Sequence, residues 1–259
     1  MSAPSPVIIS ETETKLLGLK FGRYNTQSID ADELKHGIEK ERLDVVRVKT
    51  NCLDEFAAMK LQQTGYPSYF NGGVRRYRVN SIEAPLPPFT QADVNFELYT
   101  GQHSDILEEI MNDSCGDYPL GYYRTPGLAE RITKEMESKC LFEFYAHYNN
   151  HRFFDNGYLW FMKLADKYVG FISLNVYRDH DMVDSTLAGF IKSHQSLGLF
   201  PNILRHIRQF CRDINVTYFC CGGRNENMYS QKAFEKDYMK CEGMEYIFHV
   251  VPMLSTKAK

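Results

Sequence analysis

The sequence of 259 residues has no surplus of positive charge, since 30 Lys and Arg stand against 33 Asp and Glu for a formal net charge of -3. Without a basic field to hold phosphates, binding to nucleic acid is disfavoured. The seven Cys form no CxxC pair, the spacing typical of zinc and redox sites. No stretch approaches the roughly 18 apolar residues of a membrane span, and the start lacks a basic region followed by an apolar run. We therefore expect a cytoplasmic protein with free thiols, no metal and no membrane partner.

The composition is that of a folded protein, with 43% hydrophobic and 14% aromatic residues. The length allows two modest domains or one large one. Three prolines between Ser81 and Gln91 exclude a regular helix or central strand there. The sequence therefore predicts a mobile tail over residues 1–14, one domain over 15–88 and a second over 92–259.

The pattern of apolar residues predicts an α/β chain on both sides of this boundary. The first domain is expected to hold strands at 16–21 and 43–48, and helices that begin at Asp30 and Leu53. In the second, a strand at 94–99 and a helix at 104–111 precede a long helix at about 126–148. There follow three strands of an antiparallel meander, then helix, strand, helix and strand, at 157–164, 168–177, 186–192, 201–211, 216–221, 227–238 and 245–251.

The segment from Gln195 to Phe200 is the best candidate for a binding site. It joins a predicted strand to the start of a predicted helix, where backbone N–H groups are left without partners inside the helix. Gly198 permits close approach of a ligand, Gln195 adds a donor, and the helix beyond Pro201 adds a favourable dipole. These features fit a pyrophosphate, although a glycine that only turns the chain would give the same local pattern.

The surrounding elements resemble those of the GNAT acyltransferases. In that family the loop reads Gln or Arg, two residues, Gly, one residue, then Gly or Ala, and it binds the pyrophosphate of acetyl-CoA. Gln195 and Gly198 match this pattern, and Phe200 departs from it at the last small position. The resemblance implies acetyl-CoA as cosubstrate and no metal. It implies a set of residues in contact with CoA, namely Phe190, Ile191, Lys192, Gln195, Ser196, Leu197, Gly198, Leu199, Phe200, Asn227, Ser230 and Phe234.

The helix that begins at Asn227 differs from the family at one chemically important position. Asn227 and Ser230 fit the family pattern, but Phe234 replaces the Tyr that in many members protonates the departing CoA thiolate. The acid must then come from elsewhere. Tyr238 lies one turn later if the helix continues, and Tyr229 is the second candidate. His194 is a candidate base, or else a hydrogen-bonding neighbour of the loop.

In the implied reaction an amine attacks the thioester directly, and a backbone amide around residues 190–192 stabilises the oxyanion. Short blocks at 44–48, 65–66 and 121–128 narrow the resemblance to the dTDP-fucosamine N-acetyltransferase group. This implies two GNAT-like units with mixed, mostly antiparallel sheet flanked by helices, the first unit incomplete. It also implies a nucleotide-linked amino sugar as acceptor, near a set of candidate substrate residues, Arg76, Tyr122, Tyr123 and Arg124.

Four alternatives stay open at this point. The acceptor could be another small amine, and Arg76 could be a solvated charge on a strand. The departures at Phe200 and Phe234 also fit a non-catalytic CoA-binding or interaction module. An edge strand could pair with a second copy of the chain to form a homodimer.

Overall fold

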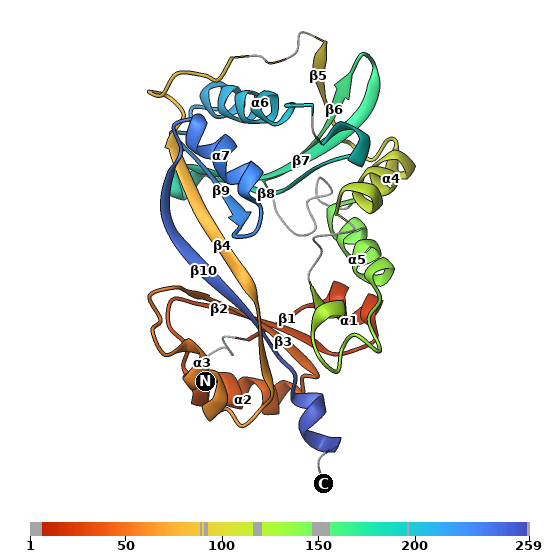
Figure 1. The fold of residues 1–259 in the computed structure, drawn as a ribbon, viewed down its shortest axis with the longest axis vertical. Coiled ribbons are helices and arrows are strands. Elements are labelled where there is room, and N and C mark those ends of the chain that lie inside the picture. The colour runs from red at the N-terminus through yellow and green to blue at the C-terminus, as the bar shows by residue number, and fades with distance from the viewer. Residues whose placement is uncertain are drawn as a thin grey trace. The chain divides into compact units, whose positions relative to one another are not determined.

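The computed structural model describes residues 7–88, 90, 93–115, 121–146, 156–195 and 197–257. The chain forms two compact units that are discontinuous in sequence. Unit 1 comprises Met1–Val74, Leu120–Cys140 and Gly243–Lys259, and unit 2 comprises Arg75–Pro119 and Leu141–Glu242. Strands β4 (Ser68–Asn80) and β10 (Lys240–Val250) each run from one unit into the other (Figure 1). The division into residues 15–88 and 92–259 stays a prediction.

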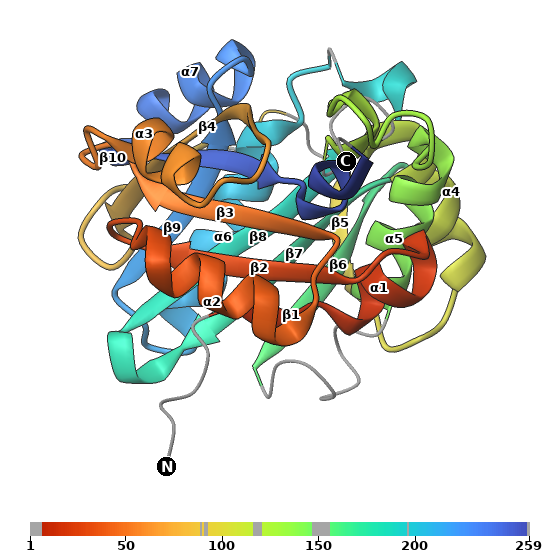
Figure 2. The ribbon, with the colours of Figure 1, turned by 90° about the horizontal axis from the view of Figure 1, so that it is seen from below.

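Unit 1 is built around a sheet with the strand order β1-β2-β3-β10-β4. Strands β2 and β3 are parallel, whereas β1 and β10 pair antiparallel with their neighbours β2 and β3. Helix α2 connects the two parallel strands and packs along them (Figure 2). The other elements are short, and the bounds are β1 Ile8–Ile9, α1 Glu11–Leu17, β2 Phe21–Thr26, α2 Ala31–Glu41, β3 Val45–Asn51 and α3 Ala57–Gln63.

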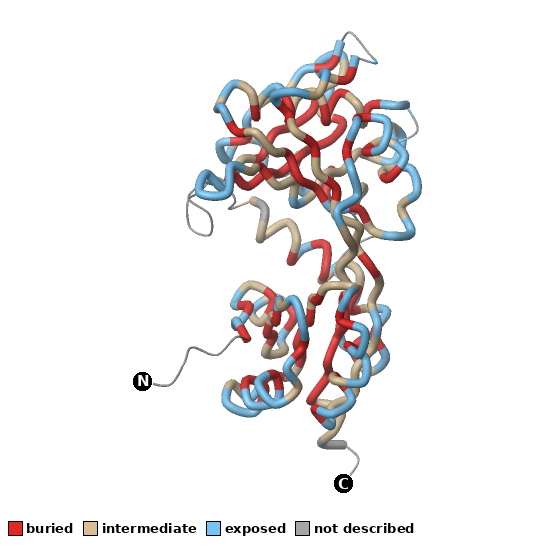
Figure 3. Tube along the Cα trace, turned by 90° about the vertical axis from the view of Figure 1, so that its left-hand side faces the viewer, coloured by how far each residue is buried: buried red, intermediate tan, exposed pale blue. Residues whose placement is uncertain are grey.

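The two faces of this sheet bury different segments. Leu34 and Ile38 of α2 pack against Val46 and Val48, which alternate with outward residues along β3. The opposite face buries apolar residues under the segment 121–140, which contains the short 3-10 helix η1 (Tyr122–Arg124) and the start of α5. The unit therefore has its own core on each side of the sheet, as the buried stretches in Figure 3 indicate.

Unit 2 has the strand order β4-β9-β8-β7-β6-β5 beyond β10. Strands β5 to β8 form an antiparallel meander, and β8 and β9 are parallel. The predicted meander is thus confirmed. The bounds are β5 Val94–Leu98, α4 Ser104–Cys115, α5 Lys134–Ala146 (which begins in unit 1), β6 Gly157–Leu164, β7 Lys167–Tyr177, β8 Met182–Phe190, α6 Phe200–Asp213, β9 Tyr218–Arg224 and α7 Met228–Lys236.

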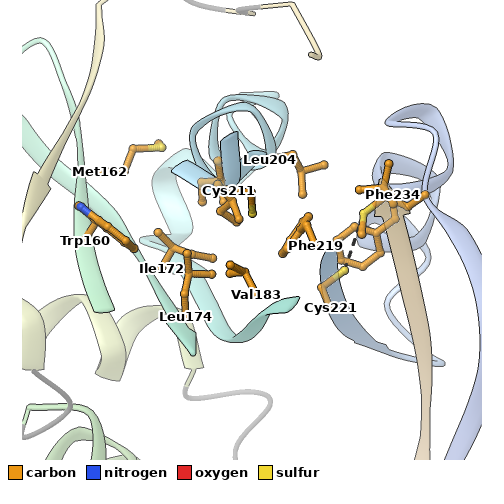
Figure 4. Close-up of a cluster of buried hydrophobic side chains, with 14 of the residues drawn as sticks. Trp160, Met162, Ile172, Leu174, Val183, Leu204, Cys211, Phe219, Cys221 and Phe234 are labelled. Atoms are coloured by element: carbon orange, nitrogen blue, oxygen red, sulfur yellow. Dashed lines mark hydrogen bonds between the residues drawn. The ribbon is translucent and has the colours of Figure 1, made fainter. Parts of the chain in front are cut away.

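Helix α6 covers one face of the unit 2 sheet and α4 covers the other. Leu204 and Cys211 of α6 lie over Val183 and Phe219 of the strands (Figure 4). Alternate residues of β6 and β7 face α4 instead, where Phe161 and several neighbours are buried. Because helices cover both faces of this sheet, β7 is buried over nearly its whole length.

The proline-rich segment 81–90 packs against α6. The carbonyl of Ala84 accepts from Arg208 Nη2 at 2.7 Å, and that of Pro87 from Arg205 Nη1 at 2.7 Å. Arg208 is fully buried and also forms an ion pair of 2.6 Å with Asp237. These donors satisfy carbonyls of a segment whose described residues form neither helix nor strand.

Several expectations about local structure were wrong, and the largest differences concern residues 11–21 and the long helix. Residues 11–17 form α1, where a tail and then a strand were predicted, and the strand begins only at Phe21. Acidic residues in the first turn of α1 and Gly18 in the left-handed conformation at its end are ordinary helix signals. The long helix begins at Lys134 because residues 126–131 form turns, and its predicted end at Tyr148 lies outside the described residues.

The expected mixed, mostly antiparallel sheet flanked by helices is confirmed. None of the helices described is long and apolar enough to span a membrane. Among those same residues, His, Cys, Asp and Glu side chains do not gather into a group that could hold a metal ion.

Candidate functional site

The parallel strands β8 and β9 part halfway along their length. Their register runs from Met182 opposite Tyr218 to Ser185 opposite Cys221. Strand β8 nevertheless continues to Phe190, still paired with β7 on its other edge. Because alternate N–H groups of a strand point to opposite edges, the stretch beyond Ser185 directs backbone groups into the opening between the two strands. We call this opening the fork.

A β-bulge lies where the fork begins. Ser173 of β7 is opposite Leu187 and Leu174 is opposite Ser185, so Thr186 is the extra residue. The Ser173 hydroxyl donates to the Leu187 carbonyl at 3.0 Å, so a side chain satisfies a backbone group at the bulge, and it lies 2.8 Å from the Thr186 hydroxyl. Bulges increase local twist, and this one lies directly after Ser185, the last residue of β8 that pairs with β9.

The loop after β8 leads directly to the start of α6. Gly198 has a φ of +69°, the left-handed region that favours glycine, and a Cβ built there would meet nothing within 4 Å in the described chain. Gln195 is exposed and its Nε2 donates to the carbonyl of Phe190 at 3.1 Å. Ser196 lies outside the described residues. The loop is therefore open on the side where Gly198 lies.

The start of α6 suits an anion. Its N-cap residue Leu199 makes no side-chain cap hydrogen bond, its first turn contains no acidic residue, and Pro201 occupies the first turn. Thr90 holds the loop from the side, because its hydroxyl donates to the Gly198 carbonyl at 2.9 Å and its N–H to Asn202 Oδ1 at 2.9 Å. The N-terminal dipole of α6 and its backbone N–H groups thus meet no carboxylate in their own turn.

Two of the amides expected to stabilise an oxyanion already have acceptors. The N–H of Ile191 donates to the carbonyl of Val169 at 3.0 Å. The N–H of Lys192 donates to Asp113 Oδ2 of α4 at 2.5 Å. Amide donors for a thioester oxygen are therefore better sought on the fork edge of β8, between Thr186 and Phe190.

Aromatic packing at the fork accounts for both departures from the GNAT pattern. The Phe200 ring lies 5.5 Å from that of Phe234 and 6.4 Å from that of Phe190. Phe234 is also 5.0 Å from Tyr77 of β4 and is 4% exposed. Phe234 is thus buried and Phe200 partly buried in one aromatic group on the α6 side of the sheet, and neither side chain offers a hydroxyl.

Helix α7 is fixed beside the fork. Asn227 is its N-cap and accepts from the Ser230 N–H at 3.1 Å. A Cβ on Gly223 would lie 3.3 Å from Ser230 Oγ and 3.1 Å from the Phe234 ring. Glycine at this position of β9 therefore permits α7 to approach the strand closely.

The two candidate acids lie on the surface. Tyr229 is 90% exposed at the start of α7. Tyr238 is 61% exposed, but the expected continuation of the helix is wrong, since α7 ends at Lys236 and Tyr238 has a φ of +63°. The chain turns there because Asp237 caps the helix and is held by the buried Arg208. His194 is in the 3-10 helix η4 (Lys192–His194), with Nδ1 2.9 Å from Ser193 Oγ.

The expected substrate residues lie in different units. Arg76 is in unit 2 and forms an ion pair of 2.7 Å with Asp184 of β8. Tyr122, Tyr123 and Arg124 form η1 in unit 1. Tyr122 is fully buried there, whereas the Tyr123 hydroxyl accepts from Arg124 Nε at 2.7 Å.

The buried thiols beside the fork are poor nucleophiles at neutral pH. Burial raises the pKa of Cys220 to about 11 and that of Cys221 well above its ordinary value. Both thiols therefore stay protonated at neutral pH and pack as small apolar groups, as their place in a buried strand predicts.

Sequence reasoning missed Asp113 and Thr90, which hold the two ends of the loop. Both contacts span long stretches of sequence, and neither residue lies in a motif. Thr90 follows the prolines, so its position shortly after a stiff connection was the one available signal.

No family model matches the sequence, and no curated protein matches it. Solved structures do match. A conserved protein of unknown function from Staphylococcus epidermidis has a TM-score of 0.63 at 12% identity, over 97% of this chain and 93% of that one. A GCN5-related N-acetyltransferase from Kribbella flavida has a TM-score of 0.59 at 10% identity, over 96% and 88%. A tandem GNAT protein from the clavulanic acid biosynthesis pathway has a TM-score of 0.52 at 8% identity, over 84% and 68%.

At these identities the likeness concerns the fold. The neighbours include both a GCN5-related N-acetyltransferase and a tandem GNAT protein, and this chain matches them over most of its length. The parted parallel strands, the loop with Gly198 and the uncapped start of α6 lie together in unit 2 of that fold. The chain therefore has the fold of the GNAT N-acetyltransferases.

Proposed function

We propose that the protein is an N-acyltransferase that moves an acetyl group from acetyl-CoA to an amine. The observation that carries this proposal is the fork between β8 and β9, which leads into a loop and a helix start free of acidic residues. The fold of the structural neighbours supports it. A fold alone does not determine an activity, whereas this site offers groups that can hold CoA.

Each part of the site has a distinct task in this proposal. The backbone N–H groups of residues 198–200 and the dipole of α6 hold the pyrophosphate of CoA. The fork edge of β8 donates to the pantetheine arm and to the thioester oxygen as it gains negative charge. The amine then forms its bond to the acyl carbon, the carbon–sulfur bond breaks, and the amine proton passes to water or to His194.

Protonation of the CoA thiolate is assigned to Tyr238 or Tyr229, since Phe234 has no hydroxyl. Both hydroxyls are on exposed side chains and can donate without breaking a buried contact. We expect the double variant Tyr229→Phe/Tyr238→Phe to lower kcat by about tenfold to a hundredfold, within the range of general acid catalysis, with little effect on acetyl-CoA affinity. Unchanged turnover in this variant would contradict the assignment and leave the transferase proposal intact.

We further propose a nucleotide-linked amino sugar as the acceptor. The support is the resemblance of residues 44–48 and 121–128 to the dTDP-fucosamine N-acetyltransferase group. Arg76 is the candidate partner of the diphosphate, because guanidinium binds phosphate in a two-pronged manner. It would have to exchange Asp184 for the ligand, and that carboxylate is 2.7 Å away.

The experiment that tests the activity is a thiol-release assay with acetyl-CoA and a panel of amines, including nucleotide amino sugars. Release of CoA that depends on an added amine supports the proposal. Acetyl-CoA binding without release for any amine favours the second candidate, a CoA-binding module without catalysis. The buried Phe234 at the position of the usual acid is the observation that keeps this second candidate open.

A further inference from the structure

A row of polar side chains crosses the sheet of unit 1. Arg23 of β2 lies opposite Arg47 of β3, and Arg47 lies opposite His249 of β10. Residues directly opposite each other in neighbouring strands project from the same face. Asn71 of the next strand, β4, extends the row, since its Nδ2 lies 3.3 Å from His249 Nε2. Four neighbouring strands therefore each contribute one polar side chain.

Most of this row is tied to buried neighbours. Arg23 Nε donates to Glu13 Oε2 at 3.0 Å, and the Tyr122 hydroxyl donates to Glu13 Oε1 at 2.9 Å. His249 Nδ1 lies 2.7 Å from Thr125 Oγ1, and the His249 ring lies 4.5 Å from that of Tyr122. Glu13 and Tyr122 are almost fully buried. The face beside the row is thus rigid and already satisfied by its own contacts.

Arg47 is the exception. Its Nε is buried and has no hydrogen-bond partner among the residues that the structure describes. The residue as a whole is half-buried, so part of its side chain is reached by solvent. A partly desolvated guanidinium without a hydrogen bond at Nε is energetically unfavourable. A bound oxyanion would supply the missing acceptor.

Arg47 shares the nearby carboxylate of Glu13 with Arg23. The pKa of Glu13 lies below its ordinary value although burial alone would raise it, because Arg23 and, more weakly, Arg47 favour the carboxylate. One carboxylate therefore faces two guanidinium groups, and Arg23 makes the direct contact with it. Lys49, the next residue on the same face of β3, already has Glu245 at 2.8 Å. Arg23 and Lys49 thus each have a carboxylate in direct contact, whereas Arg47 forms no ion pair with the residues that the structure describes.

We propose that Arg47 is the principal ligand of a binding site on unit 1 for the carboxylate or phosphate group of a small molecule. The planar guanidinium supplies paired N–H donors, which match either oxyanion. The rigid neighbours Arg23 and Tyr122 hold the face beside it. The site belongs to unit 1 and does not depend on acyl transfer by unit 2.

The test is a titration of the full chain with inorganic phosphate and, in a second arm, with succinate. The Gly198→Trp background removes phosphate binding at the loop of unit 2. Arginine side-chain NMR identifies the Arg47 Nε–Hε signal by its loss in Arg47→Gln. We expect one or both anions to move this signal with a dissociation constant of the order of 1 mM, and the arm that does so identifies the oxyanion.

Two variants make the result specific. Arg47→Gln should weaken anion binding at least about tenfold, as expected for a lost charge-assisted hydrogen bond. Lys49→Gln removes the same charge two residues away on the same strand and should change the affinity less than about twofold. An equal loss in both variants, or an Arg47 signal that neither anion moves, would overturn the proposal. A lower melting temperature of Arg47→Gln with unchanged anion affinity would also overturn the proposal, because it would show that Arg47 stabilises the fold and does not bind the anion. Acetyl-CoA binding is measured separately without the Gly198→Trp change, so the two proposals fail independently.

Discussion

Each unit contains one pair of parallel strands joined through a helix, and the two pairs differ. In unit 1 the register of β2 and β3 holds from Phe21 opposite Val45 to Thr26 opposite Thr50, the whole length of β2. In unit 2 the register of β8 and β9 stops at Ser185 and Cys221, partway along both strands. The same β-helix-β arrangement is closed in unit 1 and opens into a fork in unit 2.

The first turns of the connecting helices α2 and α6 also differ between the two units. The first turn of α2 carries Asp32 and Glu33, and the side chain of Asp30 accepts from the Glu33 N–H at 2.9 Å. The first turn of α6 has no acidic residue, and Leu199 provides no side-chain cap. A helix start that is satisfied by its own carboxylate repels phosphate, whereas one without a carboxylate attracts it. Unit 2 is therefore the unit suited to CoA. The carboxylates that stabilise the start of α2 are the same groups that make it unsuitable for phosphate.

The largest effect is expected from making α6 resemble α2. Leu197 is 46% exposed just before the helix, so Leu197→Asp adds a carboxylate where the pyrophosphate is proposed to bind. At about 5 Å and an effective dielectric of about 20, the repulsion is on the order of 3 kcal/mol, or roughly a hundredfold in the CoA dissociation constant. Calorimetry measures this change. The neutral variant Leu197→Asn is the control and should bind nearly as well as the native chain; equal weakening by both variants would contradict an electrostatic role.

A smaller effect is expected on the free energy of unfolding as the pH falls, and it arises from a histidine of α6. His206 of α6 is stacked on Phe96 at 4.0 Å, and burial lowers its pKa to about 4. Because this pKa is depressed relative to 6.5 in the unfolded chain, the contribution is present above pH 6.5 and is lost as the pH falls toward 4. We expect it to cost about 2 kcal/mol at pH 5 relative to pH 7.5.

The measurement is denaturant unfolding at several pH values, for the native chain and for His206→Phe. The variant keeps a stacked ring without a titrating nitrogen, so its stability should fall less between pH 7.5 and 5. Parallel curves for the two proteins would show that His206 does not titrate in this range.

The smallest effect compares two helix caps. Asp30 caps α2 and Asn227 caps α7 by equivalent side-chain hydrogen bonds. Replacement of either by Ala should lower the free energy of unfolding by about 1 kcal/mol. Only Asn227→Ala is expected to weaken CoA binding as well, by a few fold, because α7 lies beside the fork. If Asp30→Ala weakens binding equally, the loss reflects general destabilisation.

Much of unit 2 could be predicted from the sequence because its signals are local. Alternating apolar residues separated by Asp166-Lys167 mark the meander, and Pro201 followed by helical spacing marks α6. Residues 11–17 were harder, since a short helix with few apolar residues resembles a tail until its contacts are known. Glu13 shows this, because its buried carboxylate accepts from Arg23 and Tyr122, which lie outside the helix.

The parts of the site that short, local sequence patterns specify could be predicted. Gly198 and the start of α6 follow from the motif, whereas the parting of β8 and β9 depends on pairing between distant residues. The side chain of Asp113 on the Lys192 amide and the end of α7 before Tyr238 also arise from tertiary contacts. Local patterns carry no information on these features.

The most direct test of the account is a calorimetric titration with acetyl-CoA of the native chain, Gly198→Trp and Gly18→Trp. Gly18 has a φ of +70° and Gly198 a φ of +69°, and a Cβ on either meets nothing within 4 Å in the described chain, so both variants impose the same backbone strain. Gly18 caps α1 in unit 1. We expect micromolar binding to the native chain and to Gly18→Trp, and none to Gly198→Trp. Binding that survives in Gly198→Trp, or that is lost equally in both variants, would contradict a CoA site at the start of α6.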